Sequence, residues 1–349
     1  MNPESNGEFS VARVTRAWYV ACDSRELRAR PVARTILETP LVLFRGPDGK
    51  PAALLDRCAH RNAPLSLGRS VGGNLECAYH GWRYDTAGTC VKVPGLVGEG
   101  QKTTREVPRF PAREQDGFVW IYATPGADPA TEPFHLPAAG PGYIEVRRAV
   151  EVESTLHAAL ENALDVPHTA FLHRGLFRGA GRTHRIHARV TRSADRVEAE
   201  YSGEPRPEGL AGKILSPSGG VVTHFDRFIL PSIAQVEYRL GAENHLLVTT
   251  LCTPVEDFRT RMYAAVLLRS RFPGWLARLF LEPVALRIFR QDAEILKHQS
   301  AALRRFGGER YASTEVDVLG LQIWQLLKRA EKGDAAPAEE WARDIEMEV

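Results

Sequence analysis

The sequence has little of three things that would place it in a simpler class of protein: cysteine, long apolar runs and net charge. Only 5 cysteines occur among 349 residues, and so sparse and odd a set does not make the disulfide framework of a small secreted domain. The most apolar stretch, residues 275–289, is interrupted by Arg278, Glu282 and Arg287. It therefore falls short of the roughly 20 apolar residues that a membrane span requires.

Charge is nearly balanced as well, because 45 basic side chains face 43 acidic ones and leave a formal net charge of +2. A protein built around nucleic-acid binding normally carries a clear basic excess. Residues 1–16 hold no apolar core of the kind found in a secretory signal. We therefore expect a cytoplasmic protein with reduced thiols and with neither nucleic acid nor membrane as a partner.

Nucleotide-binding motifs are also missing. No G-x-G-x-x-G stands between a strand-like and a helix-like segment, and the glycines at 209 and 212 have the wrong spacing for a phosphate loop, with Ile214 where Ser or Thr is needed. The sequence thus offers no visible site for NAD(P)H or flavin.

The length predicts two domains, at roughly 150 residues each. The first 123 residues read as β-rich, with strand-like runs at 35–45 and 51–57 around the turn Gly46–Gly49, and a hairpin at 109–114 and 118–123 around Asp116 and Gly117. Residues 124–142 contain five prolines and read as an extended linker. We therefore place the domains at 1–142 and 143–349.

The second half mixes strands and helices. Helices are expected from a Ser154 cap through Leu164, at 275–306 and at 319–330, and residues 204–220 are expected to form a long loop. Strands are expected at 143–153, 184–190, 221–229, 234–240, 246–252 and 261–268. This layout predicts an α+β fold in which helices flank an antiparallel sheet.

The strongest motif is Cys58-Ala59-His60, followed after sixteen residues by Cys77-Ala78-Tyr79-His80. Two thiolates and two imidazoles are the ligand set of a [2Fe–2S] cluster with two Cys on one iron and two His on the other. A zinc site would use the same residue types, but it typically groups Cys with Cys and His with His. A chance cluster of buried side chains is the remaining alternative.

Neighbouring residues favour the cluster. Gly68 and Gly81 allow close approach of the backbone, and Trp82 and Pro64 are candidates for shielding the cluster from water.

A second candidate site is the pair His168 and His173. On a regular helix five residues turn about 500°, so the two rings would diverge by roughly 140°. They can share a metal only where the helix breaks, and Pro167 makes a break plausible.

Together these segments resemble the oxygenase component of the Rieske non-heme iron oxygenases, from about Trp18 to Leu303. The second motif, N-x-x-D-x-x-H-x-x-x-x-H, matches at Asn162, Asp165, His168 and His173. The resemblance implies an N-terminal all-β Rieske [2Fe–2S] domain and a C-terminal helix-grip (START-like) sheet domain. It also implies that the cluster is bound by Cys58, His60, Cys77 and His80.

By the same resemblance, the two histidines and a later carboxylate hold a catalytic Fe(II) that uses O₂. Asp292 is the best match to the family, and it shares a helix face with the apolar Ile288, Phe289, Ile295 and Leu296. Glu294 lies instead on a charged face with Arg287, Arg290 and His298, where an ion pair with Arg290 is the simpler interpretation. We therefore predict Asp292 as the third ligand.

The resemblance also assigns roles to two further residues. The matching aspartate, Asp165, links a Rieske histidine of one subunit to an iron ligand of the next, here His80 to His168; the alternative is a helix cap. Asn162 lies near the iron without binding it. A link of this kind implies a head-to-tail ring, usually a homotrimer.

The modest length resembles the homotrimeric monooxygenase and demethylase branch. We therefore predict hydroxylation or oxidative demethylation of an organic substrate that is aromatic or hydrophobic. Electrons would come from a separate NAD(P)H-dependent reductase, directly or through a ferredoxin. Desaturation, oxidative cyclisation or cis-dihydroxylation by the same iron is the alternative. An alternative from another functional class is a non-catalytic Rieske electron carrier fused to a ligand-binding domain. In such a protein His168, His173 and Asp292 would have no functional role.

Overall fold

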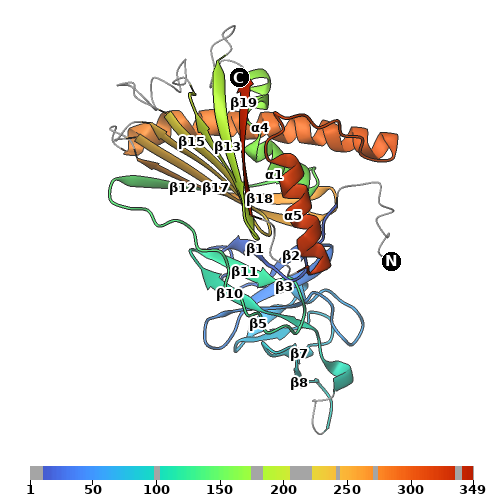
Figure 1. Cartoon of the computed structure of the whole chain (residues 1–349). Coiled ribbons are helices and arrows are strands. Elements are labelled where there is room, and N and C mark those ends of the chain that lie inside the picture. Colours follow the sequence, from blue (N-terminus) through green and yellow to red (C-terminus); the bar gives the residue numbers. More distant parts are fainter. Residues whose placement is uncertain are drawn as a thin grey trace. The chain divides into compact units, whose positions relative to one another are not determined.

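The computed structural model divides into two compact units, which are considered separately. The N-terminal unit comprises Thr15–Leu136 with Thr253–Glu256, and the C-terminal unit comprises Met1–Val14, Pro137–Cys252 and Asp257–Val349. Figure 1 shows the elements of both along the chain. The structure describes residues 11–97, 103–173, 184–204, 222–240, 244–269, 274–334 and 340–348.

The N-terminal unit is built from three small antiparallel sheets with strand orders β1-β11-β10, β2-β3-β4-β9 and β5-β6-β7-β8. Two short 3₁₀ helices accompany them, η1 (Leu65–Leu67) and η2 (Thr103–Arg105). The strands are β1 (Trp18–Asp23), β2 (Val32–Ile36), β3 (Thr39–Arg45), β4 (Pro51–Leu55), β5 (Arg69–Val71), β6 (Asn74–Glu76), β7 (Arg83–Tyr84), β8 (Cys90–Lys92), β9 (Arg109–Phe110), β10 (Ala112–Gln115) and β11 (Phe118–Tyr122).

The turns of this unit follow the sequence except at one point. Asp116 and Gly117 both have positive φ and join β10 to β11, as predicted. The expected strand at 35–45 is wrong in its first part, because the chain reverses at Leu37 and Glu38, which have φ of 49° and 62°. Neither residue favours that region, so sequence gave no signal for the hairpin.

One apolar core connects two of the small sheets, β2-β3-β4-β9 and β5-β6-β7-β8. It contains Val42, Phe44, Leu54, Leu65, Leu75 and Tyr84, and both Cys58 and Cys77 belong to it. The two thiols are therefore held where the surrounding side chains are apolar and close-packed.

The C-terminal unit is an eight-stranded antiparallel sheet with the order β12-β18-β17-β16-β15-β14-β13-β19. Its strands are β12 (Tyr143–Val152), β13 (Arg185–Arg192), β14 (Arg196–Ser202), β15 (Val222–Ile229), β16 (Ile233–Leu240), β17 (Asn244–Glu256), β18 (Arg259–Arg269) and β19 (Trp341–Glu348). An antiparallel sheet with helices against it was the predicted class, and it is confirmed.

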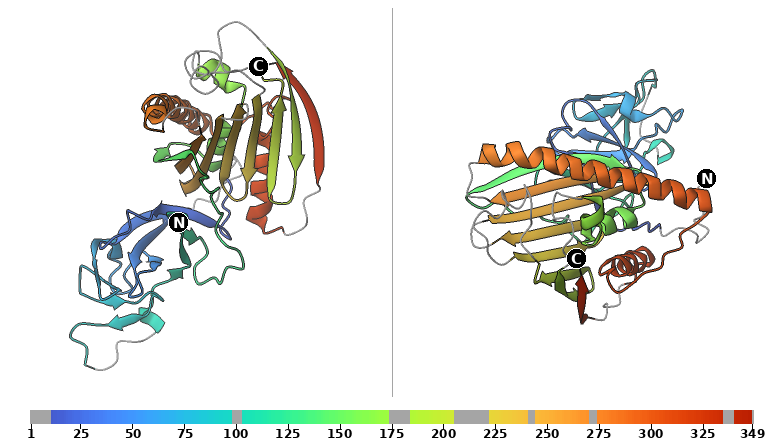
Figure 2. Two further views of the ribbon diagram at one scale, coloured as in Figure 1. Left: turned by 90° about the vertical axis from the view of Figure 1, so that its left-hand side faces the viewer. Right: turned by 90° about the horizontal axis from the view of Figure 1, so that it is seen from above.

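The helices are α1 (Leu156–Leu164), α2 (His168–Leu172), α4 (Gly274–Phe306) and α5 (Gly320–Lys332). Figure 2 shows α1 and α4 on one side of the sheet. Arg148 on β12 pairs with Glu282 on α4, and the Ser300 hydroxyl donates to the Glu153 carbonyl at 2.9 Å. These contacts define a helix-facing side of the sheet. None of the helices in the described ranges is both long and apolar enough to cross a membrane.

Two expectations for this unit need correction, and a third is not tested. The cap of α1 is Thr155 rather than Ser154. Strands β14 and β19, which both pair with β13, were missed; in β14, and in β19 from Asp344 to Glu348, buried apolar residues alternate with polar ones. Most of the loop expected at 204–220 lies outside the described residues.

Candidate active site

The two cysteine loops of the N-terminal unit have the same backbone hydrogen bonds. The Cys58 amide donates to the Ala63 carbonyl at 2.9 Å, and the Cys77 amide donates to the Trp82 carbonyl at 2.8 Å. Each cysteine carbonyl accepts from the residue four positions on, Asn62 or Gly81, at 3.0 Å. Those two residues have φ of 61° and 69°. The loops are therefore a matched pair, as the motif predicts.

The histidines of these loops lie side by side. The rings of His60 and His80 are 4.5 Å apart between centroids, and Trp82 stacks on His60 at 4.7 Å with an interplanar angle of 3°. The Trp82 ring therefore covers one face of His60, which agrees with a shielding role.

This arrangement fits a [2Fe–2S] cluster. Nδ1 of His60 is buried and has no hydrogen-bond partner, as expected of a nitrogen reserved for a metal. Burial raises the pKa of the Cys77 thiol, while the backbone N–H groups of Tyr79 and His80 act to lower it. Amides directed at a sulfur in this way stabilise the thiolate that a metal binds.

The second candidate site begins where α1 ends. Asp165 follows the helix in an extended conformation, and a new short helix, α2, starts at His168 after Pro167. The predicted break is therefore present. The break precedes both histidines, however, and α2 lies between them. His173 directly follows the last residue of α2, with φ of −104° and ψ of 39°, so the chain has left the regular helical path where the second ring begins.

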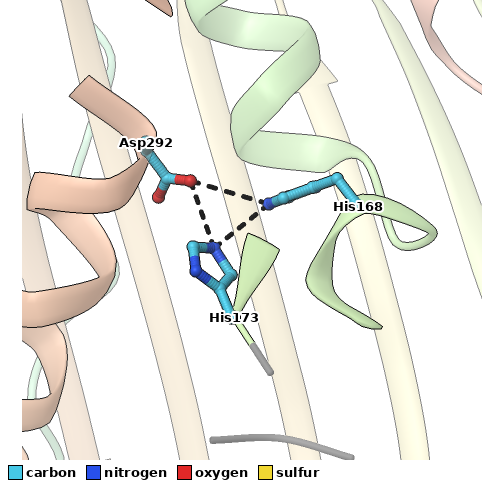
Figure 3. Close-up of side chains that lie close together, drawn as sticks. All are labelled: His168, His173 and Asp292. Atoms are coloured by element: carbon cyan, nitrogen blue, oxygen red, sulfur yellow. Dashed lines mark hydrogen bonds and ion pairs between the residues drawn. The ribbon is translucent and has the colours of Figure 1, made fainter. Parts of the chain in front are cut away.

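Three side chains converge here (Figure 3). Nε2 of His168 and Nε2 of His173 are 3.2 Å apart, and Oδ1 of Asp292 lies 3.7 Å from the first and 3.1 Å from the second. The three ligand atoms lie within 4.8 Å of one another. His173 is 2% exposed.

The convergence suits a metal. Oδ1 of Asp292 is buried without a well-directed hydrogen bond. Burial by itself would lower the pKa of His173, but Asp292 and Gln291 outweigh it and raise that pKa. Two imidazole nitrogens and one carboxylate on one side of a point form the facial triad of non-heme Fe(II) sites, with other coordination positions open.

Each imidazole also has an acceptor at its outer nitrogen. Nδ1 of His168 lies 3.2 Å from Oδ2 of Asp165, which also accepts from the His168 amide at 3.0 Å. Nδ1 of His173 lies 3.0 Å from Oε1 of Gln291. Within this chain, then, one carboxylate oxygen of Asp165 contacts both the backbone amide and the ring of His168.

Other predicted features of the site have mixed outcomes. Asn162 lies half-buried on α1, three residues before Asp165. Glu294 is exposed and pairs with His298 at 3.0 Å rather than with Arg290 as expected. Ile295 was placed on the buried face of α4 but is 46% exposed, whereas Leu296 is buried.

Sequence reasoning missed two side chains that contact the predicted ligands. Gln291 is adjacent to the predicted carboxylate, but nothing in the sequence shows that its amide reaches a residue 118 positions earlier. The Tyr84 hydroxyl lies 3.2 Å from Sγ of Cys58, across 26 positions.

Family comparisons agree with this geometry. Residues 17–111 match the model of the Rieske [2Fe-2S] domain. Residues 152–333, just over half of the chain, match the vanillate O-demethylase oxygenase C-terminal domain. The chain therefore belongs to the Rieske non-heme iron oxygenases of the vanillate O-demethylase type. A Rieske domain carries a [2Fe–2S] cluster, and the oxygenase components of this family use mononuclear iron and O₂.

Individual relatives point the same way. The chain is 42% identical over 165 residues to the oxygenase component of dicamba O-demethylase from Stenotrophomonas maltophilia, a match to 46% of this chain and 48% of that protein. It is 30% identical over 217 residues to the oxygenase component of chloroacetanilide N-alkylformylase from Rhizorhabdus wittichii, covering 60% and 61%. The matched region thus spans about half to three fifths of these curated relatives.

A solved structure of dicamba monooxygenase bound to dicamba aligns over 93% of this chain and 99% of its own. The TM-score is 0.76 and the identity 25%. The two-part fold is therefore shared over nearly the whole of that protein.

Proposed function

We propose that this chain is the terminal oxygenase of a multicomponent system, which hydroxylates or oxidatively demethylates a small organic substrate. The observation that carries the proposal is the convergence of His168, His173 and Asp292 in the same chain as the matched cysteine loops. An electron carrier would need the loops alone.

His168, His173 and Asp292 would hold the iron, which when bound supplies the activation of O₂. The residues of this chain provide position and protonation state. Asp165 and Gln291 keep the outer nitrogens of the two imidazoles hydrogen-bonded, so that both Nε2 atoms face the shared point. Asn162, on the adjacent turn of α1, is proposed to lie near the iron without binding it.

The helix-facing side of the sheet supports a hydrophobic substrate. Val146 lies two residues before Arg148 on β12 and so on the same side of the sheet; it is paired with Val266 on β18, and both valines are only half-buried. Half-buried valines on an interior side suit contact with an apolar ligand. The names of the relatives, an O-demethylase and an N-alkylformylase, favour removal of an alkyl group over cis-dihydroxylation.

Electrons are proposed to come from a separate NAD(P)H-dependent reductase, directly or through a ferredoxin, since the relatives are named as oxygenase components. We further propose a homotrimer in which Asp165 links His168 to His80 of the partner subunit. A cytoplasmic location is supported by five cysteines that all remain unpaired.

Metal content tests the proposal. Anaerobically purified protein should contain about three irons and two acid-labile sulfides per chain and give a Rieske EPR signal after reduction with dithionite. His168→Ala should lower the iron to about two, leave the sulfide and the EPR signal unchanged, and abolish turnover. Two irons in the wild type that do not rise when Fe(II) is added back would favour the electron carrier instead.

A further inference from the structure

Gln291 is the residue before Asp292 on α4, and its side chain contacts the opposite end of the same imidazole. Oε1 of Gln291 lies 3.0 Å from Nδ1 of His173, while Oδ1 of Asp292 lies 3.1 Å from Nε2. We propose that Gln291 is a positioning residue, which fixes the tautomer and the ring orientation of His173 for metal binding. This inference rests on the proposed function, because it assumes that His173 is a ligand.

The argument starts from the protons of a neutral imidazole. A histidine that binds a metal through Nε2 must carry its proton on Nδ1, and that N–H needs an acceptor. His173 is 2% exposed, so water is a poor substitute for a protein acceptor. The Gln291 carbonyl oxygen meets this need, and it favours the tautomer whose Nε2 lone pair faces His168 and Asp292.

The position of Gln291 on α4 makes the contact stiff. Gln291 and Asp292 are consecutive within a 33-residue helix, so the acceptor and the carboxylate ligand move together. His173 lies just past the end of α2, a helix of 5 residues with no side-chain cap, where the local backbone restrains the ring less. A ring held at both nitrogens by one long helix keeps its orientation even though its own segment is short.

The two imidazoles differ in the kind of acceptor they use. His168 has the carboxylate of Asp165, whereas His173 has the neutral amide of Gln291. A carboxylate acceptor makes an imidazole a stronger electron donor than an amide does. Replacing the amide of Gln291 by a carboxylate should therefore keep or strengthen metal binding, and replacing it by a thioether should weaken it.

The test measures metal uptake rather than turnover. Protein with an intact Rieske cluster is depleted of its mononuclear metal with a mild chelator and dialysed to equilibrium against Co(II), and bound cobalt is determined by elemental analysis. Gln291→Met keeps the length and helix propensity of the side chain but offers only a weak acceptor. We expect it to lower Co(II) affinity about tenfold. Gln291→Glu, which restores the acceptor, should bind Co(II) at least as tightly as the wild type.

Glu294→Gln is the matched control, since Glu294 is exposed on the same helix and pairs with His298. The visible spectrum of the cluster and the circular dichroism of each variant report on folding. If Gln291→Met does not fold, Gln291→Leu takes its place with the same expectation.

Three results would overturn the role of Gln291: unchanged affinity in Gln291→Met, a loss in Gln291→Glu as large as that in Gln291→Met, or an equal loss in Glu294→Gln. A wild-type protein that takes up no Co(II) would instead overturn the ligand set itself, and with it the proposed function.

Discussion

Tyr84 is a buried side chain of the N-terminal unit that contacts a predicted cluster ligand, Cys58. Its hydroxyl accepts from the Ala59 amide at 3.3 Å and lies 3.2 Å from Sγ of Cys58, so its proton is available to the sulfur. Burial, followed by the proximity of Cys58, raises the pKa of Tyr84 well above its usual value, so it remains a donor. A hydrogen bond to a ligand sulfur stabilises the more negative, reduced cluster.

Tyr84→Phe should therefore lower the reduction potential of the cluster. If the hydrogen bond is stronger in the reduced state by about 1.4 kcal/mol, the shift is on the order of 60 mV. A potentiometric titration followed by EPR measures it. Tyr122→Phe, which removes a hydroxyl from a tyrosine that packs on Trp18, is the control and should leave the potential unchanged. Equal potentials in Tyr84→Phe and the wild type would contradict the prediction.

His224 is a buried imidazole that the proposed function does not use. It is stacked between Tyr201 and Tyr238, with Nε2 2.9 Å from Asp226 and Nδ1 3.3 Å from Glu204. Burial acts to lower its pKa, but Asp226 and then Glu204 outweigh burial and raise it to about 9. The protonated form is therefore favoured by folding.

The raised pKa of His224 determines how folding stability changes with pH. A raised pKa adds stability that is fully present below the unfolded pKa of about 6.5 and is lost as the pH rises through 9. The loss is at most about 3 kcal/mol. Urea unfolding between pH 6.5 and 9.5 should show the wild type losing stability relative to His224→Gln. If the free energy of unfolding changes with pH in the same way in both proteins, His224 is not the cause of the pH dependence.

At the scale of elements, the segment that carries His168 and His173 follows α1, so its position depends on how α1 is held at its first residues. Oγ1 of Thr155 accepts from the Ala158 amide at 3.2 Å, and both residues are buried. Further along, Nε2 of His157 lies 2.9 Å from the Gly320 carbonyl of α5. A Cβ at Gly320 would lie 1.9 Å from Oε1 of Glu161, so a larger residue there would require the Glu161 side chain to move.

Thr155→Ala should destabilise the C-terminal unit by about 1 kcal/mol, since it leaves a buried N–H without its cap. Thr155→Ser keeps the hydroxyl and should retain most of the stability. The free energy of unfolding in urea measures both. A Thr155→Ser variant as unstable as Thr155→Ala would show that the methyl group, rather than the cap, is responsible.

At the scale of the whole molecule, the proposed ring makes each active centre a product of two chains. We expect a mass of three times the 38.7 kDa chain by light scattering. Cys58→Ser removes a cluster ligand and His168→Ala removes an iron ligand, so each variant alone should be inactive. Mixed trimers, purified through two different tags, should regain about one third of wild-type turnover, because any two-to-one ring contains one intact pair of neighbours.

Substrate-dependent O₂ uptake with a surrogate reductase measures this recovery. Mixed trimers that remain as inactive as either parent would indicate electron transfer within one chain. Monomeric wild-type protein would contradict the ring itself.

The sequence alone determined the features whose signals are local. Cys58 and His60, like Cys77 and His80, lie in short loops where spacing specifies geometry, and Pro167 marks the break between α1 and α2. Asp292 was separable from Glu294 because one helix has an apolar and a charged side, although Ile295 shows how imperfect that division is. Six of the eight strands of the large sheet were also predicted from local patterns, whereas β14 and β19 were not.

Only the tertiary structure decided what depends on pairing between distant segments. The contacts of Gln291 with His173 and of Tyr84 with Cys58, and the pairing of β19 with β13, all join segments far apart in the sequence. No local pattern encodes them. The choice of Thr155 over Ser154 as a cap likewise depends on which hydroxyl faces the helix once the chain leaves β12. Residue type and spacing specify which groups are able to bind a metal, whereas side-chain contacts made on folding specify which neighbours orient them.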